Sequence, residues 1–234
     1  MQIDNWNTKT YQEFINYLIS IKDDKYCDFN SRICRTKYKM LGIRLPMLRN
    51  IAKKIMKTDY LSFLKYVKND YYEEVIISGF VIASIKGESL FFKYFNEYIK
   101  KIDDWSISDS VCNSLVILKT NNQKYFPYFK ELALQKGEFI SRVGLVTILN
   151  FYVQEGYIEE IFIILNSISS DKYYINMAEA WLLCELYIKD PKRTLKYLKN
   201  NSLNTFTHNK AISKIKDSYR VSREEKELLN KLKR

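Results

Sequence analysis

The chain of 234 residues is long enough to bury a large core, and 47% of its residues are hydrophobic, which excludes a disordered protein. It holds only six glycines and three prolines, too few for the many turns of an all-β fold, so we expect long helices. The formal net charge of +11 predicts a polyanionic partner, nucleic acid or an anionic membrane, with a solvated basic surface as the simpler alternative.

Along the chain, apolar side chains recur at i, i+3, i+4 and i+7, which is the spacing of helices that bury one face. Short polar joints rich in Gly, Ser, Asp or Pro separate these segments and supply helix stop and start signals. The predicted helical segments are, in chain order, 60–69, 73–87, 89–102, 126–137, 142–153, 157–168, 176–188 and 193–201.

The predicted helix starts repeat with a regular period. Each is followed by a second helix after a short joint, so the chain consists of stacked helix pairs. Such pairs bury their faces against their neighbours and predict an all-α fold, an α-solenoid of HEAT-like repeats forming one domain over residues 1–234. The inner helices would line a concave basic groove. An irregular helical bundle is the alternative. The repeated starts lie near 71–72, 103–104, 137–138, 171–172 and 204–205.

Four side chains fall at related positions of the predicted inner helices. In DDWSISDSV (103–111), Trp105 and Asp109 lie one helical turn apart on one face. Arg142 occupies the early turn of the next inner helix, and Trp181 lies in the one after that. We expect these residues to converge on the groove. In the alternative interpretation, each tryptophan packs in the core and Asp109 caps a helix or favours its dipole.

Several classes of protein are disfavoured. No stretch approaches about 18 uncharged apolar residues, and the N-terminus lacks a secretory pattern, so we expect no membrane span or signal peptide. Cys27, Cys34, Cys112 and Cys184 lack Cys-x-x-Cys spacing and predict reduced thiols of a cytoplasmic protein. His208 is the only histidine, which argues against a His-ligated metal and against a Ser-His or Cys-His hydrolase.

The order of several motifs resembles one known family over nearly the whole chain. These motifs are Trp105-x-x-x-Asp109, Arg142 in S-R-V-G-L-V-T-I-L and Trp181 in A-W-L-L, with Y-K-M-L-G-I-R-L-P-M-L-R (38–49) and N-K-A-I-S-K-I-K-D-S-Y (209–219). Together they resemble the alkylpurine DNA glycosylases of the HEAT-like repeat class, the AlkD-like DNA alkylation repair proteins. The resemblance implies an α-solenoid whose basic concave face binds duplex DNA and removes N3- and N7-alkylated purines, without flipping the base into a pocket.

The resemblance also implies roles for the four side chains. Asp109 would be the catalytic carboxylate, Trp105 and Trp181 the aromatic walls, and Arg142 a contact to the DNA backbone. The chemistry suits these residue types, because an alkylated purine is already cationic and needs no strong general acid. A carboxylate stabilises the positive charge that develops on the deoxyribose as the glycosidic bond breaks. Neither a metal nor an organic cofactor is required.

Basic residues elsewhere are candidates for phosphate contacts, although any one of them is more simply explained as an exposed side chain. Two other functions stay open, because helical solenoids have many functions: a non-catalytic DNA-binding protein and a scaffold for a protein partner. We expect a monomer in the cytoplasm. The candidate cations are Arg35, Lys37, Lys39, Arg44, Arg49, Lys210, Lys214 and Lys216.

The chain departs from the family pattern at two places expected to face the lesion. Asp104 stands where the stronger glycosylases tend to carry a second tryptophan immediately before Trp105. Segment 31–34, which includes Ile33, stands where they carry an aromatic residue near the start of the helix ahead of L-G-I. The departures concern the wall of the site, whereas the candidate catalytic carboxylate is present.

Overall fold

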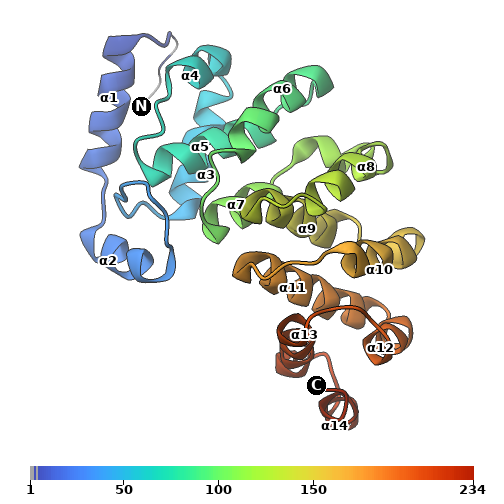
Figure 1. Cartoon of the computed structure of the whole chain (residues 1–234). Coiled ribbons are helices and arrows are strands. Elements are labelled where there is room, and N and C mark those ends of the chain that lie inside the picture. Colours follow the sequence, from blue (N-terminus) through green and yellow to red (C-terminus); the bar gives the residue numbers. More distant parts are fainter. Residues whose placement is uncertain (1–2, 4) are drawn as a thin grey trace. The chain divides into compact units, whose positions relative to one another are not determined.

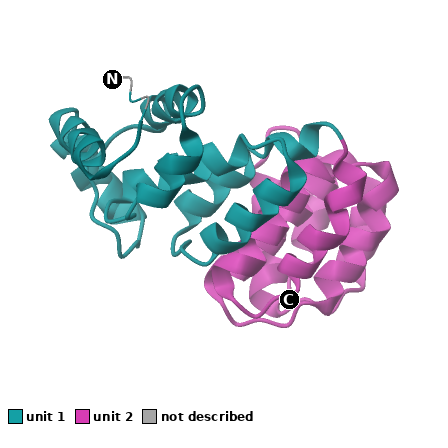
Figure 2. Cartoon of the chain, turned by 90° about the horizontal axis from the view of Figure 1, so that it is seen from above, with its two compact units in different colours: residues 1–120 teal, residues 121–234 magenta. Residues whose placement is uncertain are grey.

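The computed structural model describes residue 3 and residues 5–234, and the regular secondary structure of this part of the chain is helical throughout. An isolated bridge between Lys39 and Tyr71 is the one β-type pairing among these residues. The predicted all-α class is therefore confirmed. The helices form two compact units, residues 1–120 and 121–234, which are coloured separately in Figure 2 and are described separately here.

Unit 1 is built around a central helix, α5, all of whose residues are buried. Helices α3 and α7 both pack against α5, so α3, α5 and α7 form a row (Figure 1). The helices of unit 1 are α1 (Thr8–Ser20), α2 (Asp24–Ile33), α3 (Leu45–Ile55), α4 (Tyr60–Tyr66), α5 (Tyr72–Ala83), α6 (Glu88–Ile99) and α7 (Trp105–Cys112), followed by a 3-10 helix, η1 (Val116–Lys119).

The loop that leads into α3 is held by a buried carboxylate at the start of α5. Glu73 accepts hydrogen bonds from the backbone N–H groups of Leu41, Gly42 and Ile43, at 3.0, 2.8 and 3.2 Å. Gly42 has a φ of +81°, and a Cβ there would lie 2.2 Å from the carbonyl oxygen of Asp23. Only glycine adopts this conformation in that space at low cost. The Leu-Gly-Ile motif therefore has a structural role.

Unit 2 has two rows of helices. In one row, α9 and α13 both pack against α11 (Figure 1). In the other, Lys130 of α8 pairs with Glu160 of α10 at 2.8 Å, and Phe162 of α10 stacks on Tyr197 of α12. The helices of unit 2 are α8 (Asn122–Ala133), α9 (Glu138–Phe151), the 3-10 helix η2 (Glu155–Tyr157), α10 (Ile158–Ser167), α11 (Tyr173–Lys189), α12 (Pro191–Lys199), α13 (Thr205–Asp217) and α14 (Arg223–Asn230).

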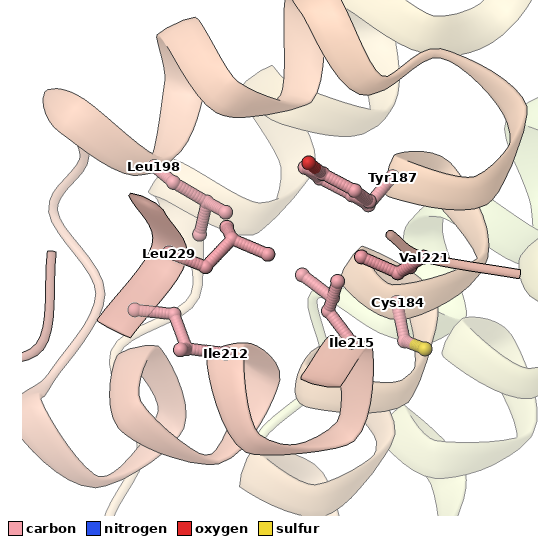
Figure 3. Close-up of a cluster of buried hydrophobic side chains, with 7 residues drawn as sticks. All are labelled: Cys184, Tyr187, Leu198, Ile212, Ile215, Val221 and Leu229. Carbon is pink, nitrogen blue, oxygen red and sulfur yellow. The ribbon is translucent and has the colours of Figure 1, made fainter. Parts of the chain in front are cut away.

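A cluster of buried hydrophobic side chains closes the C-terminal end of unit 2. Leu229 of α14 points toward Ile212 of α13 and Leu198 of α12 in this cluster, which Figure 3 shows in close-up. The single histidine, His208, is also buried in this region, where its Nε2 lies 2.8 Å from the carbonyl oxygen of Leu232. Its place within this packing gives His208 a structural role.

The predicted repeat agrees with the positions at which helices begin. Helices start at Tyr72, Trp105, Glu138, Tyr173 and Thr205, within a residue or two of the five expected starts. The order of packing within each unit is consistent with a helical solenoid. Among the described residues, no helix combines the length and apolar character needed to cross a bilayer.

One close helix crossing in unit 2 depends on the absence of a side chain. A Cβ on Gly144 of α9 would lie 2.2 Å from the backbone nitrogen of Ala133 and 2.7 Å from the carbonyl oxygen of Phe129, both in α8. Because backbone atoms cannot move aside, we expect Gly144→Ala to lower the free energy of unfolding by about 2 kcal/mol. Thermal or denaturant unfolding measures the change. Gly156→Ala is the matched control, since nothing lies within 4 Å of a Cβ there, and an equal loss in both variants would contradict this account.

Candidate functional site

The first candidate residues lie at the start of α7. Asp104 is the N-cap: its Oδ1 accepts hydrogen bonds from the Ser106 N–H at 2.8 Å and from the Ser106 hydroxyl at 2.5 Å. The helix therefore begins at Trp105 and places Asp109 one turn later. Since Asp104 caps the helix, the interpretation of Asp109 as a cap is wrong. Trp105 and Asp109 are both half-buried.

Two adjacent carboxylates tie the start of α7 to the segment that follows α2. Asp104 accepts a hydrogen bond from the Arg35 N–H, and Asp103 accepts one from the Lys37 N–H, both at 2.9 Å. The indole Nε1 of Trp105 donates to the carbonyl oxygen of Ile33, the last residue of α2, at 3.2 Å. These bonds fix the end of α2 against the ring of Trp105.

Between α2 and α7 lies a pocket of about 240 Å³. Asp109 is its one carboxylate among the described lining residues, and Cys34 is its one thiol. Burial raises the pKa of the Cys34 thiol to about 11, so this group stays protonated at neutral pH. The remaining lining is largely aromatic and aliphatic, and includes Tyr26, Phe29, Ile33, Ile43, Tyr72 and Trp105.

The sequence-based search missed the aromatic residues of α2. Tyr26 and Phe29 line the pocket, and Phe29 is 60% exposed. The Arg44 guanidinium lies 4.4 Å from the centroid of the Tyr26 ring, which positions that ring. The available signal was the i, i+3 spacing of Tyr26 and Phe29, which places both rings on one helical face. The expected place of segment 31–34 near the start of this helix is wrong, because α2 spans Asp24–Ile33 and the segment lies at its end. The aromatic residue near the start of α2 is Tyr26.

The expectation that position 104 faces the lesion is wrong for this chain. Asp104 is fully buried and does not line the pocket, because its carboxylate is engaged by Ser106 and Arg35. Ile33, in contrast, does line the pocket and is 46% exposed. Of the two positions at which the chain departs from the family pattern, only Ile33 lies at the surface of this pocket.

Arg142 and Trp181 belong to unit 2. Arg142 of α9 is 6% exposed, and its Nη1 donates to the carbonyl oxygen of Tyr174 in α11 at 2.9 Å. This contact holds two helices of unit 2 together. Trp181 of α11 is half-buried, and its neighbours in the sequence, Ala180 and Leu182, are buried. Convergence of Arg142 and Trp181 with Asp109 on one groove stays a prediction, as does the contact of Arg142 with the DNA backbone.

The candidate cations near the N-terminus have different surroundings. Arg35, Lys37 and Lys39 are exposed on the segment that Asp103 and Asp104 hold, and Arg44 is exposed at the start of α3. Arg49 instead packs over the Phe80 ring at 4.2 Å and donates to the Ser114 hydroxyl at 2.6 Å. Burial lowers the pKa of Arg49. The two contacts of its side chain hold α3 against its neighbours within unit 1.

The C-terminal cations all lie on α13 and are all half-buried. Lys216 donates to the Asn230 side chain of α14 at 2.7 Å, so part of its hydrogen-bonding capacity is used within the fold. Contact of this set with phosphate stays a prediction. The set consists of Lys210, Lys214 and Lys216.

Comparison with known proteins decides the family. The family model described as DNA alkylation repair enzyme matches residues 14–215, most of the chain. The chain belongs to the DNA alkylation repair enzyme family. No match was found among curated proteins. Membership implies a role in DNA repair with DNA as the substrate, and it agrees with the resemblance carried by the Trp105 and Asp109 motif.

Few reactive side chains line the pocket of this DNA alkylation repair family member. Among the described residues, no three His, Cys, Asp or Glu side chains are grouped so that they could hold a metal ion. The Cys34 thiol in the pocket is protonated, and Asp109 is the one carboxylate among the described lining residues. Aromatic rings close to a carboxylate suit a cationic ligand that is flat and partly apolar.

Proposed function

We propose that the protein is a DNA glycosylase that hydrolyses the N-glycosidic bond of cationic N3- and N7-alkylpurines in duplex DNA. The observation that carries this proposal is the Asp109 carboxylate in an aromatic pocket of unit 1. Membership of the DNA alkylation repair enzyme family supports it. The proposed architecture is a HEAT-like solenoid with a basic concave groove. We propose that the protein acts as a monomer in the cytoplasm and uses neither a metal nor an organic cofactor.

Asp109 stabilises the transition state by its charge. An alkylpurine cation leaves as a neutral base, so positive charge moves onto the deoxyribose as the bond to the base breaks. A fixed carboxylate beside that sugar lowers the energy of the charged species more than that of the ground state. The same carboxylate orients the attacking water and accepts its proton as the new C–O bond forms. No general acid is needed for the departing base.

The aromatic rings bind the cation before the reaction. Trp105 lies beside Asp109, and Tyr26 and Phe29 line the same pocket from α2. A cation over an aromatic face gains roughly 0.5–2 kcal/mol, depending on how far water is excluded. An unmodified purine is neutral and lacks this gain, so the rings favour alkylated over normal DNA. Trp181, on α11 of unit 2, is proposed as a further aromatic contact to the DNA.

The experiment that tests this function measures release of free base. Wild-type protein is incubated with duplex DNA containing N7-methylguanine, and released base is quantified by chromatography against a reaction without protein. We expect release well above that background, and none from unmodified duplex. Release equal to the background would overturn the glycosylase proposal. Salt-sensitive duplex binding without release would indicate a non-catalytic DNA-binding protein instead.

The exposed cations of segment 35–39 are expected to contact phosphates. Lys37→Ala should weaken binding to duplexes of any sequence and reduce the salt slope, d(log K)/d(log [salt]), by about one unit in magnitude. Fluorescence anisotropy at several salt concentrations measures the slope. Lys93→Ala, which removes an exposed lysine from α6, is the matched control and should leave the slope unchanged. An unchanged slope in Lys37→Ala would remove Lys37 from the interface.

A further inference from the structure

Four aromatic rings follow one another along unit 2, each in contact with the next. This aromatic ridge consists of Phe139, Tyr174, Tyr173 and Phe206, from the first turns of α9, α11 and α13. Successive ring centroids lie 5.2, 5.2 and 6.0 Å apart. Tyr173 is 54% exposed and Phe206 is 45% exposed, so the outer half of the ridge meets solvent.

Two side chains of α9 hold the backbone of the ridge at Tyr174. The Glu138 carboxylate accepts a hydrogen bond from the Tyr174 N–H, and the Arg142 guanidinium donates to the Tyr174 carbonyl oxygen, both at 2.9 Å. The Arg142 guanidinium also lies 5.8 Å from the centroid of the Tyr174 ring. These bonds fix the backbone of Tyr174, which directly follows Tyr173, so less order has to be gained in this turn of α11 when a ligand binds.

Cationic side chains accompany the ridge. Lys172 precedes Tyr173 directly, and Lys210 lies one helical turn after Phe206 on the same face of α13. The Lys172 ammonium donates to the backbone carbonyl oxygen of Lys136 at 2.8 Å, which fixes this positive charge beside the ridge. Nearby acidic groups are Glu138, which is engaged by Tyr174, and exposed Asp171.

We propose that the aromatic ridge binds an unpaired DNA strand, with bases stacked on Tyr173 and Phe206 and phosphates beside Lys172 and Lys210. Exposed rings interleaved with cations are the features that recognise single-stranded nucleic acid, because every base has a face that stacks and every nucleotide carries a charge. A paired duplex keeps its bases stacked on each other and offers none to the ridge. The inference goes beyond the glycosylase function, since it concerns an unpaired strand without an alkylated base and rings that take no part in the reaction.

The test compares single-stranded and duplex binding in ring-removal variants. The probe is a fluorescein-labelled oligothymidylate of about 20 nucleotides, read by anisotropy at low salt. We expect the double variant Tyr173→Ala/Phe206→Ala to bind it at least about 10-fold more weakly than wild type. Tyr173→Phe keeps the ring and should bind like wild type. A blunt unmodified duplex should bind both proteins equally.

Controls separate this result from misfolding and from the glycosylase proposal. Both substituted rings are exposed, and an unchanged circular dichroism spectrum and melting temperature will show that the double variant folds. Tyr66→Ala removes a 40% exposed ring from α4 and should leave single-strand binding intact. The probe holds no alkylated base, so the result does not depend on Asp109.

Three outcomes would overturn the proposal. The first is unchanged single-strand affinity in the double variant. The second is an equal loss of affinity for the blunt duplex, which would place the ridge against paired DNA. The third is a wild-type dimer in light scattering that becomes a monomer in the double variant, since a second copy of the chain would then cover the rings.

Discussion

Asp109→Asn is expected to lower the rate of N7-methylguanine release by about 100-fold or more. Asparagine has nearly the same shape as aspartate but carries no charge, so it no longer stabilises the cationic sugar of the transition state. The amide is also a poor acceptor for the proton of the attacking water. Single-turnover release from a duplex substrate measures this change directly, because product dissociation does not then limit the rate.

The matched control is Asp171→Asn, which removes the same charge at an exposed position of unit 2. Its release rate should equal that of wild type. Duplex affinity should be equal or slightly higher in Asp109→Asn, because the substitution makes the protein more positive. A release rate within about threefold of wild type in a folded Asp109→Asn protein would exclude Asp109 as the group that stabilises the transition state.

Glu179→Gln is expected to stabilise the protein by an amount on the order of 4 kcal/mol at about pH 8. Glu179 of α11 is 2% exposed, and its Oε1 has no hydrogen-bond partner among the described residues. Burial raises the pKa of this carboxyl from 4.5 to about 8. Ionising it inside the fold therefore costs free energy that the neutral glutamine does not.

The sign of the pH dependence follows from the raised pKa of Glu179. The folded state retains a proton that the unfolded state has released, so this group lowers stability as pH rises from about 4.5 to about 8. Chemical denaturation of wild type and Glu179→Gln across this range measures the difference. The pH-dependent part of this difference should be about 1 kcal/mol near pH 5 and about 4 kcal/mol near pH 8.

Comparing the two proteins at each pH also cancels the contributions that other titrating groups make to the free energy of unfolding. One of these is His208, whose pKa is lowered by burial. Glu224→Gln, at an exposed position of α14, is the control and should not alter the pH dependence. A gap between wild type and Glu179→Gln that does not vary with pH would contradict the raised pKa.

The sequence pattern predicted the features that depend on local spacing. Helix starts follow from polar joints and the spacing of apolar residues, so the five repeated starts were placed within a residue or two. Trp105 and Asp109 were found because a single helical turn relates them. The relation needs no knowledge of neighbouring helices, and the structure places both residues at one pocket.

Features that depend on contacts between distant segments could not be predicted. Tyr26 and Phe29 line one pocket with Asp109, and the segment after α2 is bonded to Asp103 and Asp104, more than 60 residues later. For the same reason, nothing in the local sequence shows that Arg49 stacks on Phe80 or that Arg142 reaches the Tyr174 carbonyl oxygen. An arginine inside a fold and one on a DNA surface have the same local signature.

The bonding of Glu73 to Leu41, Gly42 and Ile43 has a consequence for recognising related enzymes by sequence. Because Glu73 bonds to backbone N–H groups, this loop needs glycine at position 42 in order to close on α5, whether or not the protein reacts with DNA. A proteome search with the Leu-Gly-Ile motif will collect active and inactive members alike. Under the proposed glycosylase function, a search for active relatives would instead require Asp109 together with a pair of aromatic residues three apart in the helix that precedes the motif.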